Sequence, residues 1–327
     1  MKIAIIGAGS WGTALGIYLA RLGHSVNLWS YNDAEKDLIN NGRRCIFLPH
    51  TILPDNLYAS NSFKDVLDGA EIILHVTPSK FVRSNIAQYK KYIEPNQMLI
   101  MCSKGFESST NKTLDEVVKD ELPNVKFGVL SGPSHAEEVC ESIPTALVVA
   151  SDDDSVCDKV VDAFRSPALR MYTSHDVRGV ELGGALKNII AFCAGISVGL
   201  GLGDNAFAAL ATRGLVEISR LGTAMGGEKD TFYGLTGLGD LIVTCGSEHS
   251  RNRTAGKLIG DGKSIEETKA RVGMTIESID NIDVAHRLAK QYKVDMPILN
   301  AVYKVLYENL SPRDAVETLM TRTLKEE

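Results

Sequence analysis

The sequence lacks the signals of several classes of protein. Its six cysteines show no C-x-x-C spacing and lie mostly in apolar runs, so we expect reduced thiols in the core rather than a disulfide framework. Its seven histidines show no H-E-x-x-H motif or other paired-ligand spacing, so a metal site has no support. Repeats, low-complexity tracts and proline-rich or serine-rich linkers are also absent. These absences favour an ordinary globular protein of the cytoplasm.

Basic charge and long apolar runs are also scarce. The net charge is −6 and no basic block occurs, so we expect no nucleic-acid partner, and an anionic ligand must be met by a few local cations. The most apolar later stretch, Ile189 to Leu202, is too short to span a bilayer and contains three glycines. It predicts a buried core helix and no membrane span. No targeting segment is visible, which again favours the cytoplasm.

The beginning of the chain carries its most informative motif. The apolar run Ile3 to Ile6 predicts a buried strand, and Gly7, Gly9 and Gly12 follow it with G-x-G-x-x-G spacing. Helical spacing of leucines comes next, and Ser25 to Trp29 predicts a second strand. In this context the glycines indicate a dinucleotide site, in which the helix amides face a pyrophosphate. An incidental turn is the weaker alternative.

The rest of the chain changes its pattern near residue 175. Before it, helical stretches such as residues 111–121 separate apolar runs that predict buried strands, at residues 71–76, 98–102, 126–130 and 145–150. After it, every long segment has helical spacing. We therefore predict an α/β N-terminal domain with a doubly wound, mainly parallel Rossmann-type sheet, followed by an all-α C-terminal domain. The predicted ranges are 1–178 for dinucleotide binding and 179–327 for substrate binding and catalysis.

Two lysines have the setting of functional groups. Lys187 lies next to a wholly apolar run, so it should be partly desolvated, which favours its neutral form and suits it to proton transfer. The structural alternative is a lysine that snorkels from a buried helix. Lys104 follows a predicted strand, where ligands bind in parallel sheets, although a surface loop cation would have the same pattern.

A polar segment in the second half predicts a phosphate site. Ser250, Arg251 and Asn252 precede helix-forming residues, so a hydroxyl, a guanidinium and backbone amides would converge at a helix start. A capped helix with solvated arginines explains the same residues equally well. Upstream, the dense glycines of residues 234–239 indicate close backbone approach, either to another helix or to a ligand.

Taken in order, these motifs resemble the NAD(P)-dependent glycerol-3-phosphate dehydrogenases nearly end to end. The resemblance rests on residues 7–14, 103–105, 131–134, 181–188, 237–240 and 250–253. It implies reversible hydride transfer between dihydroxyacetone phosphate and sn-glycerol 3-phosphate, with NADPH or NADH as cofactor. It also implies a homodimer and a role in supplying glycerol 3-phosphate for phospholipid synthesis.

The resemblance assigns roles position by position. Lys187 would be the catalytic proton donor and acceptor, with Asp240 orienting it or holding substrate hydroxyls. The implied substrate-binding residues are Lys104, Gly132, Ser134, Lys187, Asp240, Ser250, Arg251 and Asn252. The cofactor-binding residues are Gly7, Gly9, Ser10, Trp11, Gly12, Tyr31, Phe81, Lys104, Ala136, Arg251 and Glu277.

One departure leaves the choice of cofactor open. The second strand ends in Ser30, Tyr31 and Asn32, which supply neither the acid of an NAD site nor the base of an NADP site. Arg43 or Arg44 could reach in from the next segment.

Two other functions also stay open. One is a reductase of the β-hydroxyacid dehydrogenase type, in which Arg251 would clamp a carboxylate. The other is a catalytically silent dinucleotide-binding sensor, which would not need Lys187, Lys104 and Asp240 together.

Overall fold

The structure, a computed structural model, describes residues 1–323 and contains two compact units. The first unit consists of residues 1–107 and 112–181, and the second of residues 108–111 and the chain from residue 182. Helix α8 (Val177–Gly199) begins in the first unit and continues in the second. The predicted second domain, 179–327, ends in residues 324–327, which lie outside the described residues.

The first unit is built on an eight-stranded sheet with the order β10-β9-β8-β5-β4-β1-β2-β3. Every neighbouring pair is parallel except β8 and β9. The chain starts in the middle of the sheet, runs to one edge, and returns to build the other half from β4, so the predicted doubly wound, mainly parallel sheet is confirmed. The strands are β1 (Lys2–Ile6), β2 (Ser25–Trp29), β3 (Leu57–Ser60), β4 (Ile72–His75), β5 (Met98–Met101), β8 (Lys126–Ser131), β9 (Thr145–Ala150) and β10 (Leu169–Ser174).

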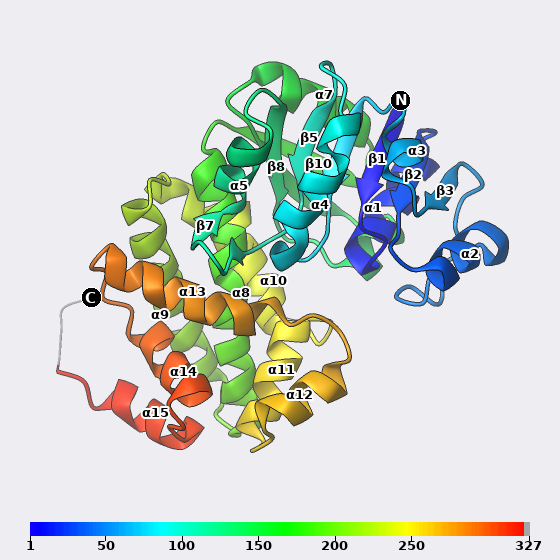
Figure 1. The fold of residues 1–327 in the computed structure, drawn as a ribbon. Coiled ribbons are helices and arrows are strands. Elements are labelled where there is room, and N and C mark those ends of the chain that lie inside the picture. Colours follow the sequence, from blue (N-terminus) through cyan, green and yellow to red (C-terminus); the bar gives the residue numbers. More distant parts are fainter. Residues whose placement is uncertain (324–327) are drawn as a thin grey trace. The chain divides into compact units, whose positions relative to one another are not determined.

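Helices cover both faces of this sheet because its central strands are apolar on both sides. On one face Ile5 of β1 shares a core with Leu15, Val139 and Val160, which belong to helices α1, α6 and α7. Helices α4 and α5 lie in front of the sheet in Figure 1. The helices of this unit are α1 (Ser10–Arg21), α2 (Asp33–Gly42), α3 (Phe63–Leu67), α4 (Val82–Tyr89), α5 (Leu114–Glu121), α6 (Ala136–Cys140) and α7 (Asp154–Phe164).

Local capping signals explain where several helices begin. The side chain of Asn32 accepts hydrogen bonds from two N–H groups in the first turn of α2. Thr113 and Glu116 form a capping box at α5. The side chain of Asp153 accepts a hydrogen bond from the N–H of Ser155 in the first turn of α7. Each such cap stabilises a helix by about 1 kcal/mol, so these short polar residues fix the helix starts.

The second unit is helical, as predicted. Its long helices are α8 (Val177–Gly199, from residue 182 onward), α9 (Asp204–Ala224), α13 (Glu277–Gln291) and α14 (Pro297–Tyr307). The shorter elements are the 3₁₀ turn η3 (Lys229–Tyr233), the π turn η4 (Leu235–Gly239), α10 (Asp240–Gly246), α11 (Arg251–Gly260), α12 (Ile265–Val272) and α15 (Pro312–Met320).

Glycines bring two of these helices into backbone contact. A Cβ atom added to Gly195 of α8 would lie 2.0 Å from the carbonyl oxygen of Arg253 in α11. A Cβ atom added to Gly256 of α11 would lie 1.9 Å from the carbonyl oxygen of Phe192 in α8. No side chain fits at either position without moving a helix, so α8 and α11 are held at a fixed crossing.

Most of the apolar stretch of residues 189–202 belongs to a helix longer than the sequence indicated, which ends at Gly199. Helix α8 has 23 residues, so the prediction that length excludes a membrane span is wrong. It is the one helix in the described part of the chain that is long and apolar enough to cross a bilayer. However, 89% of its most apolar window is buried inside the structure. A core helix explains that burial, in agreement with the predicted buried helix.

Other details differ from the predicted elements. Strands β3 and β10 were not expected, and the helix predicted over 111–121 begins only at Leu114. The two residues before it, Lys112–Thr113, form strand β7, which pairs with β6 (Phe106–Glu107) in a small antiparallel hairpin. All six cysteines are free and buried, so the prediction of core thiols without disulfides is confirmed for the structure.

Candidate active site

The turn between β1 and α1 has the geometry of a dinucleotide site. Gly7 has a φ of 122°, which only glycine adopts without strain. A Cβ atom on Gly12 would lie 1.9 Å from the carbonyl oxygen of Gly7, so helix and strand pack with no room between them. A Cβ atom on Gly9 would instead meet nothing within 4 Å. The turn is therefore open on the side where a pyrophosphate would approach.

The start of α1 supplies donors for such a group. No side chain among the described residues caps this helix, which begins at Ser10 with Trp11 in its first turn. Its first N–H groups and the positive end of its dipole thus remain available to an anion. The predicted cofactor residues of this turn therefore fit a dinucleotide.

The ends of β4, β5 and β8 lie at the same edge of the sheet as this turn, because these strands are parallel to β1. Phe81 ends the short helix η1 (Ser79–Phe81) after β4, and its side chain is 47% exposed. Lys104 follows β5 and is half-buried. After β8, the hydroxyl of Ser134 donates to the carbonyl oxygen of Gly132. Ala136 begins α6. The structure thus brings the predicted residues of the first unit to one edge.

A buried polar network fixes two of these strand ends. His75 in β4 is fully buried, and its ring nitrogens lie 2.8 Å from the hydroxyls of Tyr89 and Thr77. Ser103, which follows β5, donates its hydroxyl proton to the carbonyl oxygen of Thr77. Burial lowers the pKa of His75 to about 3, so the ring is neutral at physiological pH. The network joins the loops after β4 and β5, and the methyl group of Thr77 would lie 3.1 Å from a Cβ atom added to Gly7.

The second unit places Lys187 in a buried cluster. Its ammonium donates to Oδ1 of Asp240 at 2.9 Å and to Oγ1 of Thr244 at 2.6 Å. Lys187 is only 5% exposed, so it does not snorkel to solvent. The structure therefore pairs this lysine with a carboxylate and a hydroxyl instead of leaving it isolated in apolar surroundings.

A local turn explains how Asp240 reaches α8. The N–H of Gly239 bonds to the carbonyl oxygen of Gly234, five residues earlier, which widens this stretch into the π turn η4. Gly183 of α8 packs on the carbonyl group of Thr236 in this turn, at 3.1 Å from an added Cβ. Such π turns are frequent at functional sites. The turn starts α10 with Asp240 on its first residue, against α8.

The predicted phosphate seat forms the start of α11. Ser250 caps this helix by accepting a hydrogen bond from the N–H of Arg253. Arg251 is exposed and donates to the carbonyl oxygen of Thr275. The side-chain oxygen of Asn252 accepts from the N–H of Ser278. The structure therefore has the capped helix of the structural alternative, and an exposed guanidinium at its N-terminus as well.

Glu277 ties the start of α13 to α8. Its Oε2 accepts a hydrogen bond from Nδ2 of Asn188, the neighbour of Lys187. No motif in the sequence predicts a role for Asn188 or for Thr244. Thr244 lies four residues after Asp240, so a shared helix face was the available signal for its contact with the cluster. The helix starts of α10, α11 and α13 thus meet α8 or one another through predicted site residues.

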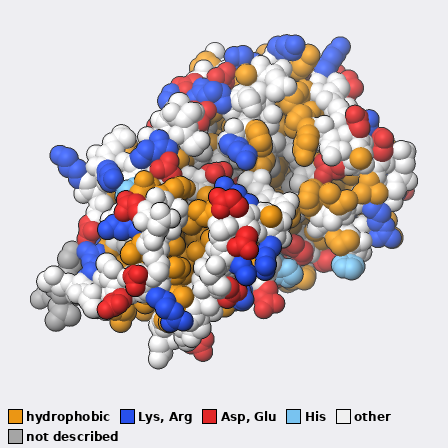
Figure 2. Space-filling view, turned by 60° about the horizontal axis from the view of Figure 1, so that its bottom comes forward, with side chains coloured by type: hydrophobic (Ala, Val, Ile, Leu, Met, Phe, Trp, Pro, Cys, Tyr) orange, Lys and Arg blue, Asp and Glu red, His pale blue; other side chains and the backbone are white. Residues whose placement is uncertain are grey.

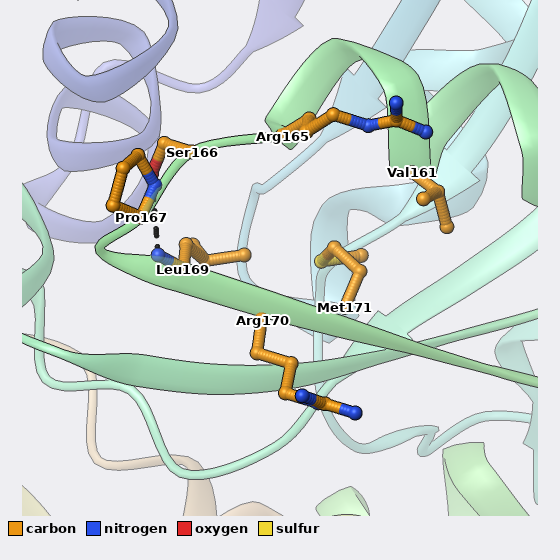
Figure 3. A pocket seen from close by; sticks show the side chains of 7 residues that line it. All are labelled: Val161, Arg165, Ser166, Pro167, Leu169, Arg170 and Met171. Carbon is orange, nitrogen blue, oxygen red and sulfur yellow. Dashed lines mark hydrogen bonds between the residues drawn. The ribbon is translucent and has the colours of Figure 1, made fainter.

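Cavities elsewhere in the structure lie apart from these residues. Figure 3 shows one in the first unit, about 340 Å³ in volume, which lies beside the end of α7 and strand β10. Arg165 and Arg170 line it, together with Val161 and Met171, and none of the predicted site residues does. Within residues 1–323, no group of three or more His, Cys, Asp and Glu side chains is placed to hold a metal ion. On the face shown in Figure 2, basic and acidic side chains are interspersed.

A parallel sheet with a dinucleotide turn, and a helical unit with a buried ammonium group, define the class of two-domain nicotinamide-dependent dehydrogenases. Residues 2–157 match the model of the N-terminus of NAD-dependent glycerol-3-phosphate dehydrogenase, and residues 176–317 match the model of its C-terminus. The chain belongs to the NAD-dependent glycerol-3-phosphate dehydrogenase family.

Individual relatives agree over the whole length. The chain is 46% identical to a glycerol-3-phosphate dehydrogenase [NAD(P)+] of Fusobacterium nucleatum, over 99% of this chain and 98% of the relative. It is 47% identical to the enzyme of the same description from a Thermoanaerobacter species, over 100% and 99%. A crystal structure of glycerol-3-phosphate dehydrogenase from Coxiella burnetii superposes with a TM-score of 0.95 at 40% identity, covering 98% of this chain and 99% of that one.

Proposed function

We propose that the protein is an NAD(P)-dependent oxidoreductase that interconverts dihydroxyacetone phosphate and sn-glycerol 3-phosphate. The observation that carries this proposal is the buried cluster of Lys187, Asp240 and Thr244 in a chain that belongs to this family from end to end. A ketone reduction needs a proton for the oxygen of the carbonyl group, and this cluster holds one.

The first unit binds the dinucleotide. The open face at Gly9 and the N–H groups of Ser10 and Trp11 hold the pyrophosphate, and Phe81 lies against the nicotinamide. The bound nicotinamide supplies the hydride. Because the cofactor carries the hydride, the residues of the chain need only bind, orient and protonate.

Lys187 gives the proton from Nζ to the carbonyl oxygen during reduction and takes it back during oxidation. Asp240 and Thr244 hold Nζ in place, because they accept two of its three N–H bonds. Lys104 adds a positive field that stabilises the charge developing on the oxygen.

The start of α11 binds the phosphate group of the substrate. Arg251 provides an exposed forked guanidinium, and Ser250 and Asn252 lie on either side of it. The positive end of the helix dipole adds to the attraction for a dianion. Lys104, Gly132 and Ser134 complete the substrate contacts that the resemblance implies.

These residue roles lead to a proposal for the domains, the assembly and the metabolic role of the protein. Residues 1–178 form the dinucleotide-binding domain, and residues 179–327 form the substrate-binding and catalytic domain. We further propose a homodimer in the cytoplasm that supplies glycerol 3-phosphate for phospholipid synthesis. Family membership supports these assignments.

A substrate panel tests the function. The purified protein is mixed with NADH or NADPH and with dihydroxyacetone phosphate, dihydroxyacetone or a 3-keto carboxylate, and the loss of reduced nicotinamide absorbance is followed. We expect fast oxidation with dihydroxyacetone phosphate alone. Preference for the keto acid would identify a reductase of the β-hydroxyacid dehydrogenase type. Dinucleotide binding without oxidation by any ketone would identify a sensor.

A further inference from the structure

An acidic side chain folds back onto the end of strand β2. Ser30 directly follows this strand and is 1% exposed, and its hydroxyl donates to Oε2 of Glu35 at 2.5 Å. Glu35 lies in the first turn of α2, where its N–H is bonded by the capping side chain of Asn32. Among residues 1–323, the other carboxylate oxygen, Oε1, has no hydrogen-bond partner. Residues 30–32, with Asp33 just beyond them, offer no clear acid in the sequence, because this one comes from the next helix.

The carboxylate of Glu35 lies near the glycine turn. The end of β2 adjoins the turn directly, because the N–H of Gly7 bonds to the carbonyl oxygen of Trp29. Burial, and to a smaller extent the negative charge of Glu35, raises the pKa of Cys45. The thiol of Cys45 in turn contacts the hydroxyl of Thr13 in α1. Cys45 therefore packs against the helix of the dinucleotide turn.

The basic residues that could have made an NADP site contact other groups. Arg43 donates to the carbonyl oxygen of Leu57 at 2.9 Å and lies over the ring of Tyr58. Lys36 pairs with Asp33. Arg44 donates to a loop carbonyl group, at Pro49. Among these charged side chains, Glu35 is the one that bonds a residue at the end of β2.

We propose that Glu35 accepts a hydrogen bond from the 2′-hydroxyl of the adenine ribose and thereby selects NADH over NADPH. This inference rests on the proposed function, since it names the cofactor form of the same site. The physical reason is twofold. A 2′-phosphate has no hydroxyl proton to donate, and its negative charge would lie against the carboxylate. Ser30 is a positioning residue, because its hydroxyl holds Oε2 and leaves Oε1 for the ribose.

The test is a binding measurement without substrate. NADH and NADPH are titrated separately into the protein, and the quenching of its tryptophan fluorescence gives two dissociation constants. We expect the wild type to bind NADH more tightly. Glu35→Gln should lower the ratio of NADH to NADPH affinity by about tenfold, the worth of one hydrogen bond to a charged group. Glu35→Arg should reverse the preference.

A matched variant distinguishes a specific hydrogen bond made by Glu35 from a general effect of negative charge on this helix. Asp37→Asn removes the same charge from an exposed position of the same helix and should leave the ratio unchanged. An equal shift in Asp37→Asn, or none in Glu35→Gln, would overturn the inference. So would a wild type that prefers NADPH and loses that preference in Arg44→Ala.

A failure of the proposed function gives a different result. In that case the wild type binds a dinucleotide but oxidises it with no ketone, or it binds neither form. A tight NADH complex with a normal reaction, combined with an unchanged ratio in Glu35→Gln, would overturn only the assignment of Glu35.

Discussion

The two units use glycine for opposite purposes. In the first unit Gly9 borders open space, and an added Cβ atom would meet nothing within 4 Å. In the second unit Gly195 and Gly256 lie inside helices, where an added Cβ atom would come within 2.0 Å and 1.9 Å of a neighbouring backbone. One kind of glycine leaves room for a ligand, and the other removes the room between two helices. The first leaves the turn open, and the second fixes the position of α8 and α11, which carry Lys187 and Arg251.

The two units also share one structural feature. Each has a buried glutamate that accepts hydrogen bonds from the first N–H groups of a helix. In the first unit Glu181 binds the N–H groups at the start of α5, and in the second Glu217 binds those of Ile298 and Leu299 in α14. Burial raises the pKa of both carboxyl groups. The two units therefore differ in how they use glycine, but they share a way to satisfy the unpaired N–H groups at the start of a helix.

The largest effect is expected where glycine closes the helix crossing. Gly256→Ala should lower the free energy of unfolding by about 3 kcal/mol, because its methyl group meets the carbonyl oxygen of Phe192 and the helices must part. Helix propensity alone predicts the opposite sign, a gain of about 1 kcal/mol. Denaturant titration measures the difference. A variant as stable as the wild type would mean that the crossing is looser than the structure shows.

An effect of similar size, which depends on pH, is expected from the capping glutamate of the second unit. Burial raises the pKa of Glu217 from 4.5 to about 7. The folded state therefore binds a proton more tightly than the unfolded state, so this contribution to stability is full below pH 4.5 and is lost as the pH rises through 7. A shift of this size corresponds to roughly 3 kcal/mol.

The variant Glu217→Gln isolates this contribution. Its unfolding free energy should depend less on pH than that of the wild type, and the difference between the two should change by roughly 3 kcal/mol across the range. Other titrating groups cancel in that difference. Parallel pH curves for the two proteins would show that Glu217 titrates normally.

The smallest change in stability is expected at the dinucleotide turn. Gly9 has a φ of −67°, which alanine also adopts, and its Cβ atom would meet open space. Gly9→Ala should therefore leave the free energy of unfolding unchanged or raise it by up to about 1 kcal/mol. The added methyl group should weaken NADH binding by about tenfold or more, since it stands where the pyrophosphate approaches. Normal NADH affinity in this variant would remove Gly9 from the site.

Much of the fold could be predicted, and the missed parts share a physical cause. The central strands are buried on both faces, so they read as continuous apolar runs. Strands β3 and β10 lie at the edges of the sheet, where each strand has exposed as well as buried residues, and their mixed composition hides them. The antiparallel pairing of β8 and β9 has no local signal either, because strand direction is decided by tertiary packing.

In the site, too, the contacts that depend on tertiary packing could not be predicted from the sequence. Spacing predicted the glycine turn and singled out Lys187, because both depend on residues close in sequence. The contact of Lys187 with Thr244 joins positions 57 apart, and that of Ser30 with Glu35 needs the helix to fold back on the strand. For residues 234–239 the sequence left a ligand or a helix as the reason for the glycines. The structure shows Gly237 against the backbone of Phe232, so packing explains that glycine.

The central claim is that Lys187 provides the proton for a ketone reduced at the expense of a nicotinamide dinucleotide. The most direct measurement compares Lys187→Ala with the wild type in the oxidation of NADH by dihydroxyacetone phosphate, with NADH binding measured on both proteins. The account predicts a turnover lower by about a hundredfold or more, with unchanged NADH affinity. Near-normal turnover in the variant would contradict it.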